Sequence, residues 1–334
     1  MNIALLVLGI GIQVLVLVDI FKTIIYINGA GFLTNFVSKT IWSLFYKLSK
    51  GNGRSKLLDL CGPMILLFFL FMWISLIWLG YSLIYMSDSA SVMNTETDTQ
   101  ATVIGKIYFV GYTLTSLGNG DYRAGSEVWQ IVSNIMGLNS MIFISLGISY
   151  LLPVLQSVID KRTLAVQITM LGSTPQAIIE NGYDGKDFSP LYQRFTNLES
   201  ILVKHGERHL AYPILHYFHS NDRRYALPLK LATLDEVVLI QKLYNIDDSS
   251  KNFHWEILGA TLNNFYERLD SNFVIEADEV PPFDYKDKLP KEFAHKVLSK
   301  PQFELKNVEE RRKKIRGYVR NDGWTWDDVI RSPE

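Results

Sequence analysis

Long apolar runs separated by charged stretches are the first pattern along this chain. Neither Leu60–Met86 nor Val128–Ile159 contains a charged side chain. A third run, Ile3–Tyr26, is interrupted only by Asp19 and Lys22. A helix needs about 20 predominantly apolar residues to cross the hydrocarbon core of a bilayer. The pattern therefore predicts three membrane-spanning helices.

Charged residues are distributed unevenly. They are sparse up to Asp160 and much more frequent from Lys161 onward. The first part has the composition of a membrane domain and the second that of a soluble domain. A straight helix over Val128–Ile159 would be about 48 Å long, which exceeds a hydrocarbon core of about 30 Å. We therefore expect this helix to tilt, to kink or to continue out of the membrane.

The segment 1–27 has two interpretations. A cleaved signal peptide would begin with a basic segment and end at small residues, but Met1 and Asn2 carry no charged side chain. We therefore expect residues 1–27 to be a retained N-terminal span. Cleavage would leave the topology of the later spans unchanged.

Basic residues indicate the orientation, because cytoplasmic loops carry an excess of Lys and Arg. The connection Ser87–Val103 carries three acids and no base, and Lys161 and Arg162 follow the last span. We expect a multi-pass protein of the plasma membrane with its N-terminus outside and its C-terminal half inside. The connection Asn28–Leu58, expected inside, carries five bases and no acid: Lys39, Lys47, Lys50, Arg54 and Lys56.

Two smaller features lie near the inner end of the first span. Phe32–Leu48 has one apolar helical stripe with lysines on the other side, which is typical of an interfacial helix or of an ordinary packed helix. Asp19 and Lys22 lie one helical turn apart. An intramembrane carboxylate is a candidate functional group, but an ion pair between neighbouring turns is the simpler explanation. We expect that pair.

A short polar motif lies between the second and third spans. Thr113–Asp121 reads TLTSLGNGD and follows a weakly helical stretch from about Thr102 to Thr115. Asn-Gly alone would indicate a hairpin turn. A helix followed by glycine-spaced backbone, re-entering between two spans, is the arrangement of an ion-selectivity filter.

The motif resembles the filter of the tetrameric potassium-channel family, commonly TVGYGD preceded by a further Thr. The resemblance covers roughly Leu60–Ile159 and departs from the family at Asn119, where an aromatic residue is usual. The remaining positions correspond as follows: Thr115 and Ser116 to the two hydroxyl residues, Leu117 to the valine, and Gly118, Gly120 and Asp121 to identical residues.

This resemblance implies an all-α membrane protein with a potassium-channel-type pore module. Its parts would be an outer helix at 60–86, a pore helix at 102–115, a filter at 116–121 and an inner helix at 128–159. The complete module would cover residues 59–162. It would follow the extra N-terminal span (1–27) and a cytoplasmic linker (28–58), and would precede an all-helical cytoplasmic regulatory or assembly domain (163–334).

The resemblance also implies a function. One chain carries one filter, so a pore requires a homotetramer in the lipid bilayer, conducting monovalent cations, most simply potassium. Rings of backbone carbonyls would bind the ions, and alternate left-handed residues are needed to line them up. Gly118 and Gly120 permit that conformation. The expected ion-binding residues are Thr115, Ser116, Leu117, Gly118, Asn119, Gly120 and Asp121.

Asn119 is shorter and more polar than the aromatic residue of the family. We expect Tyr108, Phe109 and Tyr112 on the pore helix to compensate, or only to pack there. Discrimination of potassium from sodium is left open. Two alternatives are a weakly selective cation channel and a membrane-anchored signalling or interaction protein with a vestigial pore. Asp121 would make the mouth electronegative, and the loop acids Asp88, Glu96 and Asp98 either add to that field or serve solubility.

The last span is unusually rich in small and polar residues, which suits either a wet cavity or close helix packing. Gly137 and Gly147 are candidate gating hinges, and Pro153 is expected to kink the helix near a cytoplasmic gate.

The second half has a helical pattern with little strand signal. We expect helices at Leu191–Phe218, interrupted at Pro213, and at Leu229–Leu243, His254–Leu269 and Glu309–Val319, with a helix start at Ser173–Pro175. There is no GxGxxG after a strand, no run of short strands and no P-loop.

Four histidines, His205, His209, His216 and His219, follow one another closely in the sequence. We expect them to pack and to form hydrogen bonds; zinc binding and proton sensing are alternatives. We expect no enzyme activity, no cofactor, no metal beyond the permeant ion and no nucleic-acid partner. The sequence does not specify a cytoplasmic ligand or partner protein.

Overall fold

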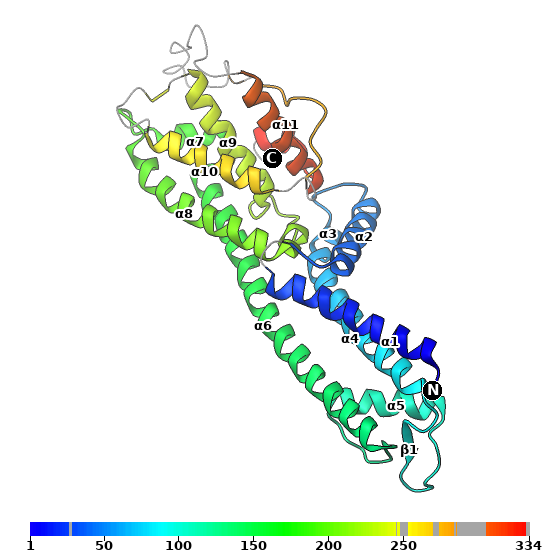
Figure 1. Ribbon diagram of the computed structural model, residues 1–334. Coiled ribbons are helices and arrows are strands. Elements are labelled where there is room, and N and C mark those ends of the chain that lie inside the picture. Colours follow the sequence, from blue (N-terminus) through cyan, green and yellow to red (C-terminus); the bar gives the residue numbers. More distant parts are fainter. Residues whose placement is uncertain are drawn as a thin grey trace. The chain divides into compact units, whose positions relative to one another are not determined.

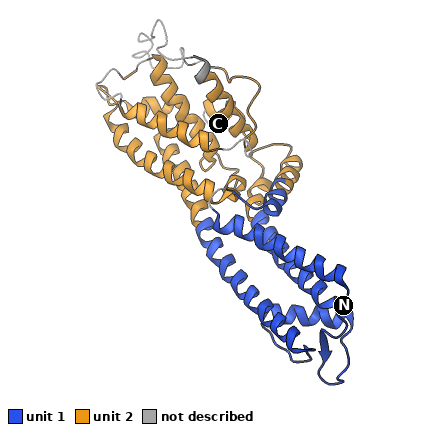
Figure 2. Cartoon of the chain, viewed as in Figure 1, with its two compact units in different colours: residues 1–39, 64–155 blue, residues 40–63, 156–334 orange. Residues whose placement is uncertain are grey.

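The computed structural model describes residues 1–26, 29–244, 246–247, 253–269, 274–283, 285 and 305–331. The chain forms two compact units (Figure 2): unit 1 comprises Met1–Lys39 and Met64–Leu155, and unit 2 comprises Thr40–Pro63 and Gln156–Glu334. The expected domain limit between residues 27 and 28, and the last three residues, lie outside the described part.

Within the described ranges, three helices are long and apolar enough to cross a membrane, as predicted. The first is α1 (Ile3–Ile20), which continues as a short π-helix at Phe21–Ile25. The second is α4 (Cys61–Met86), preceded by the short α3 (Lys56–Asp59). The third is α6 (Glu127–Leu171) (Figure 1).

The first span packs closely on the second within unit 1. The side chain of Asn2 caps α1 by accepting from the amides of Ala4 and Leu5. At Gly9 an added Cβ would lie 2.6 Å from the backbone oxygen of Gly80, so the two helices touch through their glycines, as small residues allow. One turn further, Gln13 Nε2 donates to the carbonyl of Ile77 at 2.8 Å.

The segment between α4 and α6 contains one helix and one small sheet. The helix α5 (Val103–Leu114) begins after Thr102, whose hydroxyl accepts from the amide of Gly105, and ends one residue before Thr115. The strands β1 (Val92–Asn94) and β2 (Tyr122–Ala124) pair antiparallel, with Met93 opposite Arg123. The helix expected over 102–115 is α5, which has these bounds to within a residue at each end.

Helix α6 has 45 residues, so it is about 68 Å long. Of the three alternatives expected for the last span, which were tilt, kink and continuation, the helix continues past Ile159 to Leu171. The helix runs through the expected domain limit at residue 162 without a break. It also runs through Pro153, which lacks an amide hydrogen for the helical ladder. Residues up to Leu155 belong to unit 1, and those from Gln156 belong to unit 2.

The second unit is helical, as its pattern predicted. Helix α7 starts as expected, with Thr174 as its N-cap and Pro175 as its first residue. The Thr174 hydroxyl accepts from the amide of Ala177 at 3.1 Å. The elements are α2 (Phe32–Leu48, whose first part belongs to unit 1), α7 (Pro175–Gly182), α8 (Ser189–Ala211), a 3₁₀ turn (Pro213–Tyr217), α9 (Leu227–Tyr244), α10 (Phe253–Arg268), α11 (Leu305–Asn321) and α12 (Asp327–Ile330).

Helix α9 forms the centre of this unit, and nearly all of its residues are buried. Trp255 packs edge-on against Phe188 and Phe195, with ring centroids 5.8 and 4.9 Å away. Two acids of α9 are buried beside arginines of α11. Glu236 forms a two-pronged pair with Arg312, at 3.0 and 3.1 Å. This unit therefore has an ordinary globular core of the kind that burial of apolar surface stabilises.

Candidate functional site

The motif Thr113–Asp121 follows α5 and is not a hairpin. The strand β2 after it pairs with β1 from the preceding connection, and a helix rather than a strand precedes the motif. The amide of Leu117 returns to the carbonyl of Tyr112 at 2.9 Å, which closes the end of α5. The carbonyl end of the helix dipole is therefore next to the motif, and this end favours cations.

The backbone of the motif alternates in conformation. Ser116, Gly118 and Gly120 have positive φ angles of 58°, 62° and 82°. The prediction for the two glycines is confirmed. Ser116 was not foreseen, and a left-handed residue with a side chain costs of order 1 kcal/mol or more. Alternation of left-handed residues is the backbone condition under which successive carbonyls can line one axis.

Several carbonyls of this stretch have no partner in the described part of the chain. Among the described residues, the carbonyls of Ser116 through Asn119 accept no hydrogen bond. All residues from Thr115 to Asp121 are exposed. Buried or not, backbone carbonyls are strong acceptors. These four exposed carbonyls can therefore accept from a donor or coordinate a dehydrated cation.

Asn119 has a specific partner on α5. Its side-chain amide donates to the hydroxyl of Tyr108, and that hydroxyl donates to Asp121 Oδ2 at 3.2 Å. The expected compensation is therefore found at Tyr108. Tyr112 instead donates to the carbonyl of Tyr122 at 2.6 Å, which holds the chain just after the motif.

Phe109 does not reach Asn119. Its ring packs on those of Tyr85 and Tyr112, with centroids 5.3 and 5.4 Å away, and it belongs to the interior of unit 1. The alternative of simple helix packing therefore holds for this residue.

The connection before α5 fixes the far end of the motif, which the sequence did not reveal. The hydroxyl of Thr95 donates to the carbonyl of Gly120 at 2.8 Å, and its amide donates to the carbonyl of Asp121 at 2.9 Å. Together with the β1–β2 ladder, these bonds attach the connection to the exit of the motif. Threonine in a polar loop gives no signal of such a contact.

Two of the loop acids have local partners. Asp98 pairs with Arg123 at 2.6 Å, with both side chains exposed. Asp88 accepts from Trp129 Nε1 at 3.0 Å, and this bond is the main reason that its pKa lies below the usual value. Glu96 is exposed. Asp121 remains the acid closest in sequence to the carbonyl row.

Polar residues of α6 contact the rest of unit 1. Ser140 donates to the carbonyl of Leu114 at the end of α5, and the Asn139 amide donates to Tyr81 at 3.3 Å. An added Cβ at Gly137 or Gly147 would meet no atom within 4 Å. Among the polar residues of the span, these two therefore serve helix packing, whereas the two glycines have open space beside them.

The ion pair expected between Asp19 and Lys22 is wrong. The Asp19 carboxylate is buried and accepts from the Leu33 amide at 2.8 Å, the Thr34 hydroxyl at 2.7 Å and Trp73 Nε1 at 2.9 Å. Lys22 is exposed. The carboxylate caps the start of α2, because helix amide ends attract negative charge. This tertiary contact outweighs a pair on the surface of one helix.

Helix α2 divides its apolar stripe between two environments. Trp42 packs near Tyr217 and His219 of unit 2, at 5.9 and 6.5 Å between ring centroids. Phe36 and Leu48 are exposed. The helix has its predicted bounds, and its stripe is partly packed and partly exposed.

The histidines of unit 2 do not form one group. His205 and His209 are buried and His216 is half-buried beside them, with successive ring centroids 6.1 and 5.8 Å apart. Burial lowers the pKa of each, that of His209 to about 3. The described residues contain no group of three metal-binding side chains placed to hold an ion.

His219 lies apart from the other three histidines. It contacts Asp322 at 3.1 Å and the Gly53 carbonyl at 2.7 Å. Burial alone would lower its pKa, but these partners raise it.

The comparisons place the chain among membrane proteins. No family model matches it, and no solved structure matches it. The chain is 30% identical over 315 residues to the uncharacterized membrane protein YdjJ of Bacillus subtilis strain 168, and the alignment covers 93% of this chain and 91% of that protein. The alignment with a membrane protein covers nearly the whole chain, and three of the helices have the length and apolar character of membrane spans. Both observations indicate a membrane protein. The chain is a membrane protein and belongs to the same family as YdjJ.

Proposed function

We propose that this protein is a cation channel whose pore is formed by four copies of the chain. The segment Thr115–Asp121 lines the pore, α5 is the pore helix, and α4 and α6 are the outer and inner helices. The N-terminus and the pore mouth face the outside of the plasma membrane, and the C-terminal half is cytoplasmic. The permeant ions are monovalent cations, most simply potassium.

One observation carries the proposal. Positive φ angles alternate at Ser116, Gly118 and Gly120, and the carbonyls from Ser116 to Asn119 have no partner within the described residues. A dehydrated cation needs such oxygens. They follow directly on the carbonyl end of a helix between two candidate spans, and this end stabilises positive charge.

Flux through reconstituted protein tests the proposal. Vesicles loaded with potassium should release it only when they contain the protein, and the purified protein should have the mass of four chains. Absence of cation flux under all ligands, voltages and pH values tried would favour the alternative of a signalling protein with a vestigial pore.

Matched glycine variants locate the pore. Gly118→Ala should abolish most flux, because alanine disfavours the positive φ of 62° although no atom lies within 4 Å of the new Cβ. Gly11→Ala in α1 is the control, since its Cβ also meets no atom within 4 Å and its position is helical. If both variants conduct equally, the filter is assigned to the wrong segment.

A weakly selective channel is the second candidate, and Asn119 favours it. The Asn119 side chain is fixed by a hydrogen bond to the hydroxyl of Tyr108, which is itself partly exposed. The aromatic residue usual at this position would be fixed by packing of its ring. The reversal potential in asymmetric potassium and sodium separates the two candidates, because a value near zero excludes potassium selectivity. Tyr108→Phe should move that potential toward zero, since it removes only the oxygen that joins Asn119 to Asp121.

A further inference from the structure

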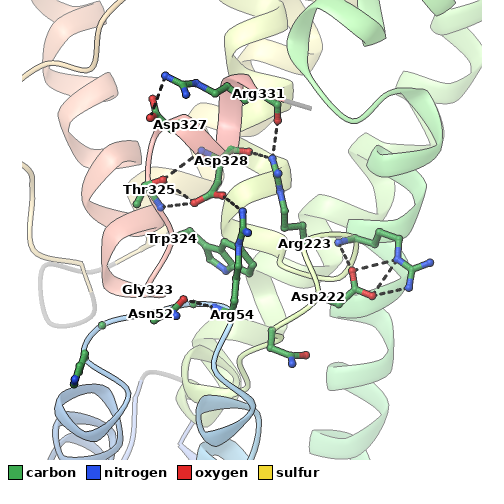
Figure 3. Close-up of a pocket in the computed structure, with 15 residues that line it drawn as sticks. Asn52, Arg54, Asp222, Arg223, Gly323, Trp324, Thr325, Asp327, Asp328 and Arg331 are labelled. Atoms are coloured by element: carbon green, nitrogen blue, oxygen red, sulfur yellow. Dashed lines mark hydrogen bonds and ion pairs between the residues drawn. The ribbon is translucent and has the colours of Figure 1, made fainter. Parts of the chain in front are cut away.

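A cavity of about 1060 Å³ lies within unit 2 (Figure 3). Three segments far apart in the sequence line it: residues 50–54 between α2 and α3, residues 221–224 before α9, and residues 323–331 around α12. Sites for small molecules commonly have volumes of roughly 300–1,000 Å³. The cavity is therefore large enough for a small organic anion and not only for a simple ion.

Backbone contacts fix the walls of the cavity. The Gly53 amide donates to the Gly323 carbonyl at 2.7 Å, and a Cβ at Gly53 would lie 2.8 Å from that oxygen. The amide of Asn221 donates to Asp59 Oδ1 at 2.6 Å. The first bond joins residues 50–54 to residues 323–331, and the second joins residues 221–224 to the short helix α3 that follows residues 50–54. The charged side chains thus project from a frame that is held by the main chain.

Positive charge exceeds negative charge around the cavity. Three of the lining arginines have carboxylate partners: Arg224 with Asp222 at 2.6 Å, Arg331 with Asp327 at 3.4 Å and Arg54 with Asp328 at 3.0 Å. The other two lining bases are Lys50 and Arg223, and neither has a carboxylate partner among the described residues. The cavity therefore keeps two uncompensated positive charges.

Arg223 and Arg54 both bind to the same residue, Asp328. Its Nη2 donates to the backbone carbonyls of Asp328 and Arg331, the latter at 2.8 Å, while Arg54 occupies the carboxylate of the same Asp328. That carboxylate also accepts from the Thr325 hydroxyl at 2.7 Å. Partial burial lowers the pKa of Arg223, the nearby carboxylate of Asp328 raises it, and the charge of Arg54 lowers it; the net pKa lies below the usual value. Asp328 therefore accepts hydrogen bonds from Arg54 and Thr325 through its carboxylate, and from Arg223 through its backbone carbonyl.

We propose that this cavity binds a phosphate-bearing small anion, whose phosphate is received by Arg54 and Arg223. Guanidinium groups match the geometry of phosphate oxygens through paired N–H donors. A dianionic phosphate would neutralise the surplus charge left by Arg223 and Lys50. The cavity accommodates a polar body beyond the phosphate.

The phosphate has two sources with the same chemistry. One is a soluble phosphorylated metabolite. The other is the headgroup of an anionic lipid, because Arg54 shortly precedes the start of α4 at Cys61, and basic sites beside spans attract such headgroups. The binding site itself does not depend on the proposed pore.

Binding to the full chain tests the proposal. Purified protein in neutral detergent is titrated with inorganic pyrophosphate and with adenosine triphosphate, against sodium chloride at equal ionic strength, while thermal unfolding is recorded. In the second arm, the protein is placed in nanodiscs of phosphatidylcholine with or without phosphatidylinositol phosphates. A saturable rise in the melting temperature in either arm supports the proposal and identifies the source.

Variants assign that rise to the cavity. Arg54→Gln and Arg223→Gln should each weaken binding about tenfold or more, because a hydrogen bond to a charged group is lost. Arg331→Gln, at a 73% exposed side chain, keeps the test available if Arg223→Gln misfolds, and it should weaken binding less. Arg268→Gln removes an arginine that pairs with Glu207 on another surface and should bind as wild type.

Two results would overturn the proposal. One is a wild-type protein that responds to neither soluble phosphates nor phosphoinositides beyond the salt control. The other is an equal loss of binding in Arg54→Gln and in Arg268→Gln, since that would reflect overall charge and not the cavity. Neither result bears on cation flux, so failure here is separate from failure of the proposed channel.

Discussion

The two units bury polar groups in opposite ways. In unit 1, the buried Asp19 and Gln13 bond to neighbouring helices, while most apolar side chains of the spans are exposed in the protomer. In unit 2 the apolar side chains form the core, and buried charges such as Glu236 and Arg312 pair with each other. Lipid is as apolar as leucine, so burial of leucine cannot drive helix association there. Polar contacts therefore specify the packing of unit 1, and apolar contacts specify that of unit 2.

The largest effect is expected in the core of unit 2. Arg312→Ala leaves Glu236 buried without its partner and should cost about 3–5 kcal/mol of unfolding free energy. Burial already raises the pKa of Glu236 to about 7 with Arg312 in place, so the pair itself adds little. The double variant Arg312→Met with Glu236→Leu should therefore recover most of the loss in denaturant unfolding. A double variant as unstable as the single one would contradict this.

A smaller loss is expected at Asp19 in unit 1. Asp19→Ala removes the acceptor of the Leu33 amide, the Thr34 hydroxyl and the Trp73 indole, which should cost about 3 kcal/mol. Hydrogen exchange at the first turn of α2 should accelerate. Lys22→Ala is the control and should change neither quantity; equal effects of the two variants would restore the ion pair that the sequence suggested.

Acid should weaken unit 2 through its buried histidines. The folded-state pKa values of His205, His209 and His216 lie below the ordinary 6.5, so the unfolded chain binds more protons as the pH falls. The contribution of these three histidines to stability is fully present above pH 6.5 and is lost as the pH falls below it, by about 1.4 kcal/mol per pH unit for each histidine. His205→Phe, beside Phe265, should flatten the dependence of the melting temperature on pH between neutrality and moderate acid. An unchanged slope would show that His205 is not one of the responsible groups.

The smallest effect is expected at the exposed pair Arg123–Asp98, beside β2. Both side chains are more than half exposed, and such pairs contribute less than about 1 kcal/mol. Arg123→Gln should shift the thermal midpoint little, and less still at high salt. A large drop in the thermal midpoint would mean that exposed ion pairs also help to specify the packing of unit 1.

Periodicity and composition were enough to predict the helices but not their contacts. The stripe of Phe32–Leu48 gives the bounds of α2, and Thr102 and Thr115 bracket α5, because caps and apolar spacing are local properties. The carboxylate that caps α2 comes from Asp19 in the preceding helix α1, and no local pattern encodes such a partner. The same holds for Thr95 at the carbonyl of Gly120.

At the candidate site, glycine spacing predicted two of the three left-handed residues. Ser116 could not be predicted, because serine has no preference for positive φ and adopts it here under the constraint of the α5 terminus. Tyr108 was one of three aromatic candidates to compensate for Asn119, and only the fold selects among them. The cavity at Arg54 and Arg223 joins segments from opposite sides of the long α6 in the sequence, which charge patterns in one sequence do not reveal.

The free carbonyls from Ser116 to Asn119 have a consequence for biogenesis. A backbone group left without a partner in lipid costs several kcal/mol, so a newly inserted chain that stays alone in the bilayer would carry this cost at each of four residues. In the proposed tetramer, assembly would remove this cost, and by mass action it would do so only at sufficient local concentration. Scarce expression should therefore leave chains open to membrane quality control, and their half-life should lengthen as copy number rises.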